Sequence, residues 1–379
     1  MLRIALQILY ADKGKYIGLV AGIVFATLLM SQQVSIFFGL LSRTAAQIGD
    51  VREASLWVMD PRVQYMEEFE PMRDIELSKV RSVPGVLWAT PYYKGFAVVN
   101  TFISQSQQVF LMGVDDVSLI PYPNNMIVGK WTDLMQPESM VMDKNGWQFL
   151  FPGEPIKVPR EIEINDRRVL IVGVCEVSAP FMTFPIVFTR YSEAIKLAPQ
   201  KRNSLSFILV REQPGENISM VQKRITEQTG LQALTNQEFK RRTINHILTR
   251  TGIPINFGIT VTLGFIVGAA VTGQTFYIFV LDKLRQYAAL KAIGVSNGQI
   301  IRMVLSQAAI VGFVGYSLGV GFTAVFFNSM ADNPAFKGFY FLWEVMLGTG
   351  VAVAIIIVST CLFSLRRVLV VDPAVVFRG

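Results

Sequence analysis

The sequence has little charge, one histidine and two cysteines, and each scarcity excludes a class of protein. Only 17% of its 379 residues are charged and 51% are hydrophobic, whereas an average soluble domain has about 25% charged residues. Disorder is excluded, because disordered chains are rich in charge and poor in apolar residues. The single histidine, His246, excludes most histidine metal sites and most catalysis by a histidine base. These limits leave an integral membrane protein with a sizeable polar domain.

Long stretches without charge predict the membrane-spanning segments. Four stretches of 27, 31, 29 and 21 residues carry no Asp, Glu, Lys or Arg, and a helix needs about 20 apolar residues to cross the hydrocarbon core. They predict transmembrane helices near residues 17–41, 256–280, 304–327 and 343–364. The first stretch is too long for the apolar part of a signal peptide, and no convincing cleavage site follows it, so we expect a retained helix. Residues 1–16 form either an interfacial helix or the start of this span.

The excess of basic residues predicts the orientation of the chain. Residues 1–16 carry a net charge of +2, residues 282–302 of +3 and residues 366–379 of +2, which together equal the net charge of the protein, +7. By the positive-inside rule these three segments are cytoplasmic, and residues 43–250 lie outside. The basic excess therefore indicates topology. Nucleic-acid binding is not expected, because no patch interleaves basic and aromatic residues.

Residues 43–250 are predicted to form a large α+β domain between the first and second spans. Runs rich in Val, Ile and Phe predict strands at 86–99, 108–114, 162–174, 186–189 and 205–211. The pair Asn165-Asp166 predicts a hairpin turn inside the third run. The segment 74–86 is expected to form a short helix that is ended by Pro84-Gly85, and 217–229 a second helix that is ended by Gly230.

This domain shows no pattern of a catalytic or metal site. Glu67, Glu68 and Glu70 are expected in a solvated loop, and Asp115 and Asp116 in a turn. The pair Gly129-Lys130 lacks the other residues of a phosphate-binding loop. We therefore expect no cofactor, no metal and no catalytic residue, and any ATP must be bound by another subunit. The two cysteines, Cys175 and Cys361, fall in regions on different sides of the membrane boundary, so no disulfide is expected.

The segment between the second and third spans carries the most specific pattern. Residues 283–293 predict a short amphipathic helix parallel to the membrane, stopped by Gly294. Ser296 and Gln299 have the spacing of a capping box, which starts the next helix. A helix held between two spans in this way transmits force, because it cannot rotate without moving both. An ordinary interfacial loop is the alternative.

The layout and two motifs resemble the FtsX/MacB-type permeases of ABC transporters. In that family the helix after span two follows a pattern like K-E-x-x-x-L-[KR]-A-[IL]-G, which is matched here by Arg285, Leu290, Lys291, Ala292, Ile293 and Gly294. The tail resembles the family's closing D-P-x-x-x-[LF]-R through Asp372, Pro373, Phe377 and Arg378. The segments QYAALKAIG (286–294) and AGIVFATLLM (21–30, in the first span) resemble sequences of the DevC-like subgroup most closely.

The resemblance implies that helix 283–293 docks in a groove of a separate ATPase. The implied coupling residues are Lys283, Arg285, Gln286, Tyr287, Leu290, Lys291, Ala292 and Gly294. We expect Tyr287 and Leu290 to be the buried anchors of this interface, with charged residues at its rim. Gln286 and Gln307 stand where many relatives have Glu, which weakens any salt bridge to the ATPase.

The resemblance also implies an assembly. It implies a non-catalytic, homodimeric, multi-pass permease of the bacterial inner membrane, driven by two copies of an ABC ATPase. DevC-like members work with a periplasmic membrane-fusion adaptor and a TolC-like outer-membrane channel as a tripartite export system. The implied cargo is a glycolipid or another amphiphile, so membrane lipid is a further implied partner.

The implied organisation has three parts. These are an N-terminal segment with span one (1–42), a periplasmic MacB-like domain (43–250) and an FtsX-like permease domain with spans two to four (251–379). Two other functions stay open: an FtsX-like signal transducer that regulates periplasmic cell-wall hydrolases, and a lipoprotein-releasing permease. A membrane-bound enzyme is disfavoured by the lone histidine and the missing nucleophile motifs.

Overall fold

The computed structural model describes residues 7–370, apart from residues 10, 11, 69, 101–105, 124, 199–204, 332, 334, 335 and 337, with side chains described up to residue 365. Half of the segment 1–16 (residues 1–6, 10 and 11) and the closing motif with Asp372, Pro373, Phe377 and Arg378 lie outside the described residues. The chain divides into two compact units. A helical unit comprises Met1–Gly39, Gly252–Asp332 and Phe339–Gly379, and a sheet domain comprises Leu40–Thr251 and Asn333–Gly338.

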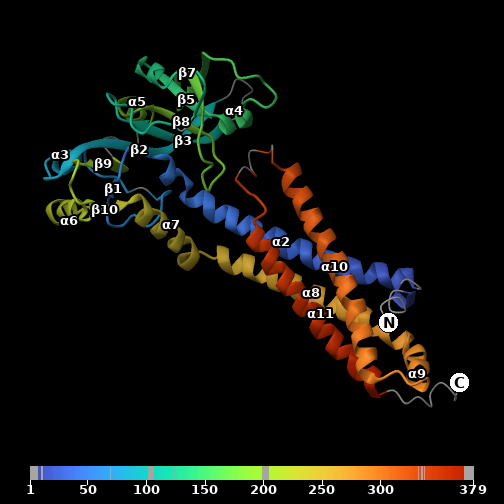
Figure 1. The fold of residues 1–379 in the computed structure, drawn as a ribbon. Helices are drawn as coiled ribbons and strands as arrows, with labels where there is room; N and C mark the ends of the chain where they lie inside the picture. Colours follow the sequence, from blue (N-terminus) through green and yellow to red (C-terminus); the bar gives the residue numbers. More distant parts are fainter. Residues whose placement is uncertain are drawn as a thin grey trace. The chain divides into compact units, whose positions relative to one another are not determined.

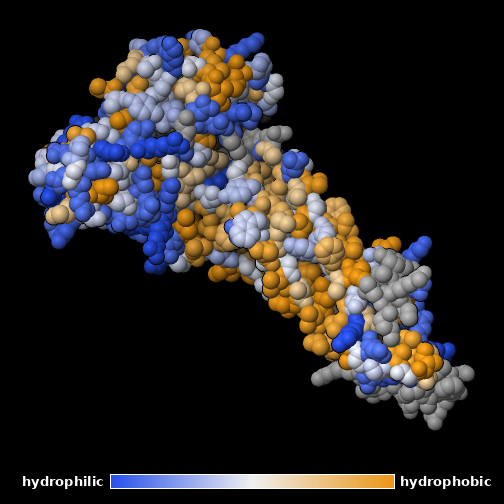
Figure 2. All heavy atoms as spheres, in the orientation of Figure 1, coloured by the Kyte–Doolittle hydropathy of each residue, from blue (hydrophilic) through white to orange (hydrophobic). Residues whose placement is uncertain are grey.

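The helical unit contains four helices that are long and apolar enough to cross a membrane. They are α2 (Lys13–Asp50), α8 (Ile253–Asp282), α10 (Asn297–Ser329) and α11 (Trp343–Val370), with the short α9 (Leu284–Ala292) between α8 and α10 (Figure 1). Figure 2 shows hydrophobic residues along the outer surface of these helices, as helices in contact with lipid require. All four predicted spans are confirmed as long apolar helices.

Glycines bring α2 close to its two neighbours in the helical unit. A methyl group added at Gly319 of α10 would lie 2.6 Å from Thr27 Cβ, and one added at Gly268 of α8 would lie 2.3 Å from Ala26 Cβ. Only a residue without a side chain fits at these positions. Small residues at such contacts are the usual basis of helix association in lipid, where no hydrophobic driving force acts between helices.

The sheet domain is built on a mixed sheet of ten strands among the described residues, in the order β10-β1-β9-β2-β3-β8-β5-β7-β4, with β6 pairing β2 and β7. The pairs β3–β8 and β5–β7 are parallel, and the other pairs are antiparallel. The strands are β1 (Leu56–Met59), β2 (Val86–Asn100), β3 (Ser106–Val114), β4 (Asn125–Val128), β5 (Ser139–Asp143), β6 (Arg160–Ile164), β7 (Arg167–Glu176), β8 (Ile186–Arg190), β9 (Phe207–Glu212) and β10 (Gln232–Thr235).

Helices cover both faces of this sheet, so both faces are buried. Tyr92 and Phe110 pack in one core, while their neighbours Tyr93 and Val109 point to the other, as the alternation along strands requires. The helices are α3 (Asp74–Arg81), α4 (Lys144–Leu150), α5 (Tyr191–Leu197), α6 (Ile218–Thr229) and α7 (Asn236–Arg250), with a 3-10 turn η1 (Trp131–Met135). The α+β class is confirmed.

Several local predictions in this domain are confirmed by backbone geometry. Asn165 and Asp166 both have positive φ, of 46° and 64°, and join β6 to β7; this is the conformation that a type I′ hairpin turn needs. Gly230 ends α6 with φ 72°. The short helix predicted within 74–86 is α3, which ends at Arg81, shortly before Pro84 and Gly85 as expected. Strands β1, β4, β5 and β10 and helices α4, α5 and α7 were not predicted.

The helix α2 is much longer than its predicted span. Its 38 residues extend over about 57 Å at 1.5 Å per residue, whereas the hydrocarbon core is about 30 Å thick. The last eleven residues, Leu40–Asp50, belong to the sheet domain, where Ile48 is fully buried in the core with Trp57 and Phe239. One unbroken helix therefore contributes to both units.

Replacing Gly319 with leucine should destabilise the helical unit. The new side chain has no room beside Thr27, and overpacking of a tight contact costs about 1–3 kcal/mol. We expect Gly319→Leu to lower the thermal midpoint of the purified protein in detergent. The matched control is Gly321→Leu, two residues further along α10, where an added Cβ meets open space. Equal midpoints for the two variants would contradict close packing of α2 on α10.

Candidate coupling sites on α9 and α2

The end of α9 and the start of α10 are each fixed by a local motif. At the end of α9, Gly294 has φ 94°, its N–H donates to the carbonyl of Lys291, and the N–H of Val295 donates to the carbonyl of Leu290, both over 3.0 Å. This pair of bonds is a Schellman motif, which needs a residue with positive φ and so favours glycine. Ser296 then caps α10 in a capping box with Gln299. Both sequence predictions are confirmed.

One face of α9 packs against its own helical unit. Tyr287 and Ala288 are fully buried, and the Tyr287 hydroxyl donates to Gln307 Oε1 of α10 over 3.3 Å. Gln307 is also fully buried, where a carboxylate would carry a large desolvation cost. Gln307 therefore holds α9 from inside and is not placed to contact another subunit.

The opposite face of α9 is exposed and carries most of the surface available to a partner. The exposed residues of α9 and its C-cap are Arg285, Gln286, Ala289, Ala292 and Ile293, which are spaced as one side of a helix. Ile293 is 78% exposed, an unusual position for a large apolar side chain. The centre of this face is thus apolar, with polar residues at one end.

The predicted coupling residues divide between these faces. Arg285, Gln286, Ala292 and Gly294 are exposed, and Lys283, Leu290 and Lys291 are half-buried. Tyr287 was expected to be an anchor against a partner, and its side chain is fully buried within its own unit. Ala289 and Ile293, which are exposed on the same face as Arg285, were not among the predicted coupling residues.

The second site lies where α2 meets the sheet. Lys94 of β2 is fully buried, and its ammonium group donates to Gln47 Oε1 of α2 over 2.8 Å and lies 4.8 Å from the centre of the Phe110 ring. Burial lowers the pKa of Lys94 to about 8, and the charge of Glu67 opposes this shift. A lysine is rarely buried completely unless its charge is paired, so this contact ties α2 to β2 at some cost in stability.

A second tie holds the last residue of α2. Asp50 accepts hydrogen bonds from the backbone N–H and the hydroxyl of Ser178, both over 2.8 Å. Ser178 lies in the loop between β7 and β8, which is also held by a bond from Met182 N–H to Glu67. Glu67 is therefore not a freely solvated residue as predicted, whereas Asp115 accepts from Val117 and Ser118 in the expected turn.

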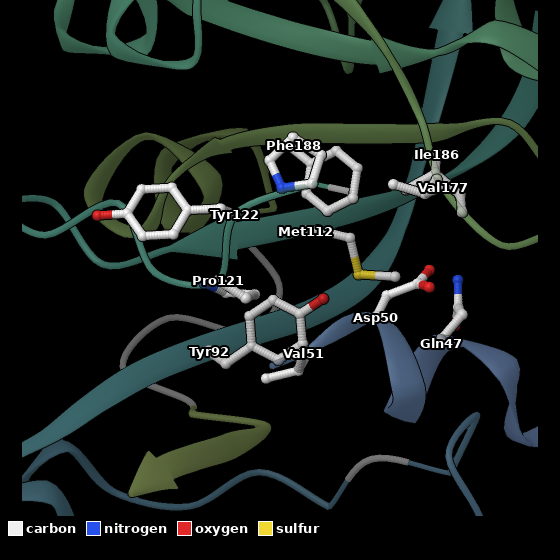
Figure 3. A pocket seen from close by; sticks show the side chains of 11 residues that line it. Gln47, Asp50, Val51, Tyr92, Met112, Pro121, Tyr122, Val177, Ile186 and Phe188 are labelled. Atoms are coloured by element: carbon white, nitrogen blue, oxygen red, sulfur yellow. The ribbon is translucent and has the colours of Figure 1, made fainter. Parts of the chain in front are cut away.

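An open cleft of about 360 Å³ lies beside these ties (Figure 3). Figure 3 shows Gln47 and Asp50 next to each other on the last turn of α2, with Tyr92 on the neighbouring strand. The rest of the lining is mainly apolar and comprises Val51, Met112, Pro121, Tyr122, Pro123, Val177, Ile186 and Phe188. No group of acidic, histidine or cysteine residues suited to a metal occurs among the described residues.

The chain belongs to the family of FtsX/MacB-like permeases of ABC transporters. Residues 17–228 match the MacB-like periplasmic core domain, and residues 258–373 match the FtsX-like permease C-terminal domain. An ABC transporter permease of Mycobacterium tuberculosis is 24% identical over 314 residues, which cover 82% of this chain and 80% of the relative. One from Mycobacterium bovis is 22% identical over 316 residues, with coverages of 82% and 80%.

Solved structures of related extracytoplasmic domains also align with the chain. The periplasmic region of MacB from Actinobacillus actinomycetemcomitans aligns with a TM-score of 0.38 at 11% identity, over 54% of this chain and 96% of that one. The extracellular domain of the ABC-type transporter YknZ from Gram-positive bacteria aligns with a TM-score of 0.35 at 12% identity, over 48% and 99%.

Membership of this family defines the protein's class. It is a multi-pass membrane protein with an extracellular domain, and a permease of an ABC transporter works with an ATPase partner. Its relatives are named permeases, which implies a non-catalytic subunit. The expected resemblance to FtsX/MacB-type permeases is confirmed.

The burial of Lys94 predicts a pH dependence of stability. Below pH 8 the folded state holds a buried charge, whereas above 10.5, the ordinary lysine pKa, both states are neutral. Wild type should therefore gain stability relative to Lys94→Met as the pH rises from 8 to 10.5, by up to about 3 kcal/mol. Chemical unfolding of the whole chain in detergent at several pH values measures this difference. Parallel curves for the two proteins would show that Lys94 is not a buried charge.

Proposed function

We propose that this protein is the membrane subunit of an exporter, and that it converts ATP hydrolysis on a separate ATPase into movement of the sheet domain. The observation that carries this proposal is the continuity of α2, which runs without a break from the helical unit to Asp50 inside the sheet domain. A helix is stiff along its axis, so displacement of its membrane segment reaches the ties at Gln47 and Asp50.

The exposed face of α9 is the proposed contact with the ATPase. Binding energy in interfaces concentrates in central apolar and aromatic anchors, and exposed ion pairs contribute only about 0–1 kcal/mol. Ile293 is therefore the proposed anchor, flanked by Ala289 and Ala292, with Arg285 and Gln286 at the rim. Lys283, Leu290, Lys291 and Gly294 keep a supporting role, since they position the helix and its end.

The cargo is proposed to be a lipid, a glycolipid or another amphiphile. The four predicted spans contain no charged residue except Glu344 at one end, and charged residues in such segments usually mark paths for ions and polar solutes. An amphiphile can instead be taken from the membrane and moved by the sheet domain. The family resemblance supports a homodimer with two ATPase copies, a periplasmic adaptor and an outer-membrane channel.

A signal transducer is the second candidate, and the same lack of a polar path supports it. In that case movement of the sheet domain is itself the output and regulates a cell-wall hydrolase. Adjacent genes for an adaptor favour export, whereas a gene for a peptidoglycan hydrolase favours regulation. A second, paralogous permease gene would indicate lipoprotein release. Lipid flux in a deletion strain tests the transport proposal directly.

A charge at the apolar end of the exposed face should detach the ATPase. We expect Ile293→Asp to lower the affinity for the ATPase by roughly thirtyfold, equivalent to the loss of about 2 kcal/mol at an interface anchor. The measurement is co-purification of the ATPase from membranes, together with its ATP hydrolysis. Gln286→Glu is the control and should bind normally, because relatives carry Glu there. Normal binding by Ile293→Asp would leave α9 as an ordinary interfacial loop.

The orientation can be tested by cysteine labelling. The proposal places α9 and both termini in the cytoplasm, and the sheet domain in the periplasm. The native cysteines are buried, so a new cysteine at Val117, which is 82% exposed, or at Ile293 reports its own side of the membrane. A membrane-impermeant maleimide should label Val117→Cys in cells with a permeabilised outer membrane, and Ile293→Cys only after the inner membrane is opened. The reverse pattern would overturn the orientation.

A further inference from the structure

A row of hydroxyl groups runs along α2 inside the helical unit. Thr27, Ser31 and Ser35 are four residues apart, and all three are fully buried. This spacing places them on one face of the helix, one turn above the other. Hydroxyl groups inside a membrane bundle need partners, because neither water nor lipid tails can satisfy them.

The middle hydroxyl of this row is bonded across to α10. Ser31 Oγ and Thr323 Oγ1 lie 2.7 Å apart, and each also lies within bonding distance of a carbonyl of its own helix, Thr27 O and Gly319 O. One hydroxyl therefore donates to its carbonyl while the other donates across the interface. By contrast, Thr27 Oγ1 and Ser35 Oγ have no hydrogen-bond partner in the part of the chain that the structure describes.

The surface of α10 that faces α2 carries glycines one turn apart. On α10, Gly315 faces Ile23 and Gly319 faces Thr27. These contacts and the Ser31–Thr323 pair advance by four residues together on both helices, so α2 and α10 run parallel with a repeat of one turn. If α2 moves by one turn, each of these α10 residues therefore faces the α2 residue four positions away from its present partner.

The helix α8 presents a similar surface to α2. Gly268 faces Ala26, and Gly264 faces Leu29 and Met30. If α2 moves one turn toward its C-terminal end, Gly22 comes to face Gly268 in place of Ala26, so no larger group enters this tight contact. The opposite movement would bring Met30 against Gly268. The tight contact at Gly268 therefore favours movement toward the C-terminal end.

We propose that α2 has two registers on α10, related by a shift of one helical turn toward the C-terminal end of α2. In the described register Thr323 bonds to Ser31. In the shifted register Thr323 bonds to Thr27, and α2 is displaced by about 6 Å, four residues at 1.5 Å each. One-turn shifts of packed elements are an established form of two-state switching, and here a hydroxyl at each end of the shift keeps Thr323 satisfied.

This inference rests on the proposed function, since the ATPase supplies the bias between the two registers. Because α2 is continuous to Asp50, a shift of its membrane part displaces the Gln47 and Asp50 ends by the same amount. Thr27, Ser31 and Thr323 are positioning residues in this scheme. They set where the helix stops and take no part in binding cargo or nucleotide.

Paired cysteines test the two registers directly. In the complete complex with its ATPase in lipid nanodiscs, with Cys175 and Cys361 replaced by alanine, Ser31→Cys with Thr323→Cys should cross-link without nucleotide. A non-hydrolysable ATP analogue should lower this yield about tenfold and raise that of Thr27→Cys with Thr323→Cys about tenfold, as a change of dominant register requires. Unchanged yields for both pairs, in a complex that binds the analogue, would overturn the proposal.

Two single substitutions give an independent readout. Thr27→Val and Ser35→Ala each remove a buried hydroxyl without a partner in the described register, so neither should lower thermal stability. Thr27→Val should nevertheless reduce transport-stimulated ATP hydrolysis about tenfold, because the shifted register loses its hydrogen bond, whereas Ser35→Ala should leave it unchanged. Equal activities would overturn the two-register scheme. If the wild-type protein did not bind an ATPase at all, that result would instead contradict the proposed function.

Discussion

The hydrocarbon core imposes the constraint on which this structure depends. No water is available there to satisfy backbone N–H and C=O groups, so each membrane segment must be a helix. In α2 the same hydrogen-bonded ladder continues past the hydrocarbon to Asp50, where Ile48 enters the core of the sheet domain. The membrane anchor and a structural element of the sheet domain are thereby parts of one continuous helix.

The polar groups on α2 follow the environments that it crosses. Within the bundle the fully buried polar side chains of α2 are the small hydroxyls of Thr27, Ser31 and Ser35, which fit between close-packed helices and can exchange partners because single interhelical hydrogen bonds are weak. At its far end they are Gln47 and Asp50, whose bonds reach a buried ammonium group and the Ser178 loop. Breaking the contact with Lys94 would leave a buried charge without its acceptor, which is costly. The fixed contacts thus lie in the sheet domain, and the exchangeable ones lie in the membrane.

Sequence alone predicted the features that depend on local chemistry. Four charge-free stretches predicted the spans, and single residues such as Asn165, Gly230 and Gly294 predicted turns and caps, because few residues tolerate positive φ. The strands β1 and β10 escaped prediction because they are only four residues long, and both are held by partners far away in the chain. The extension of α2 also escaped, since Arg43 and Asp50 look like the start of a soluble loop until the sheet that surrounds them is known.

Helix α9 shows why an amphipathic pattern alone does not identify a binding surface. Its sequence shows that apolar residues occupy α9, but not whether they face the protein's own bundle or a partner. The structure assigns Tyr287 to the bundle, where its bond to Gln307 consumes the one polar atom that would make it a selective anchor. A carboxylate at position 307 could also accept from Tyr287, but as a buried charge it would carry a large desolvation cost that the neutral Gln307 avoids. The apolar surface left for another protein then centres on Ile293, the residue that the glycine cap at Gly294 holds out into solvent.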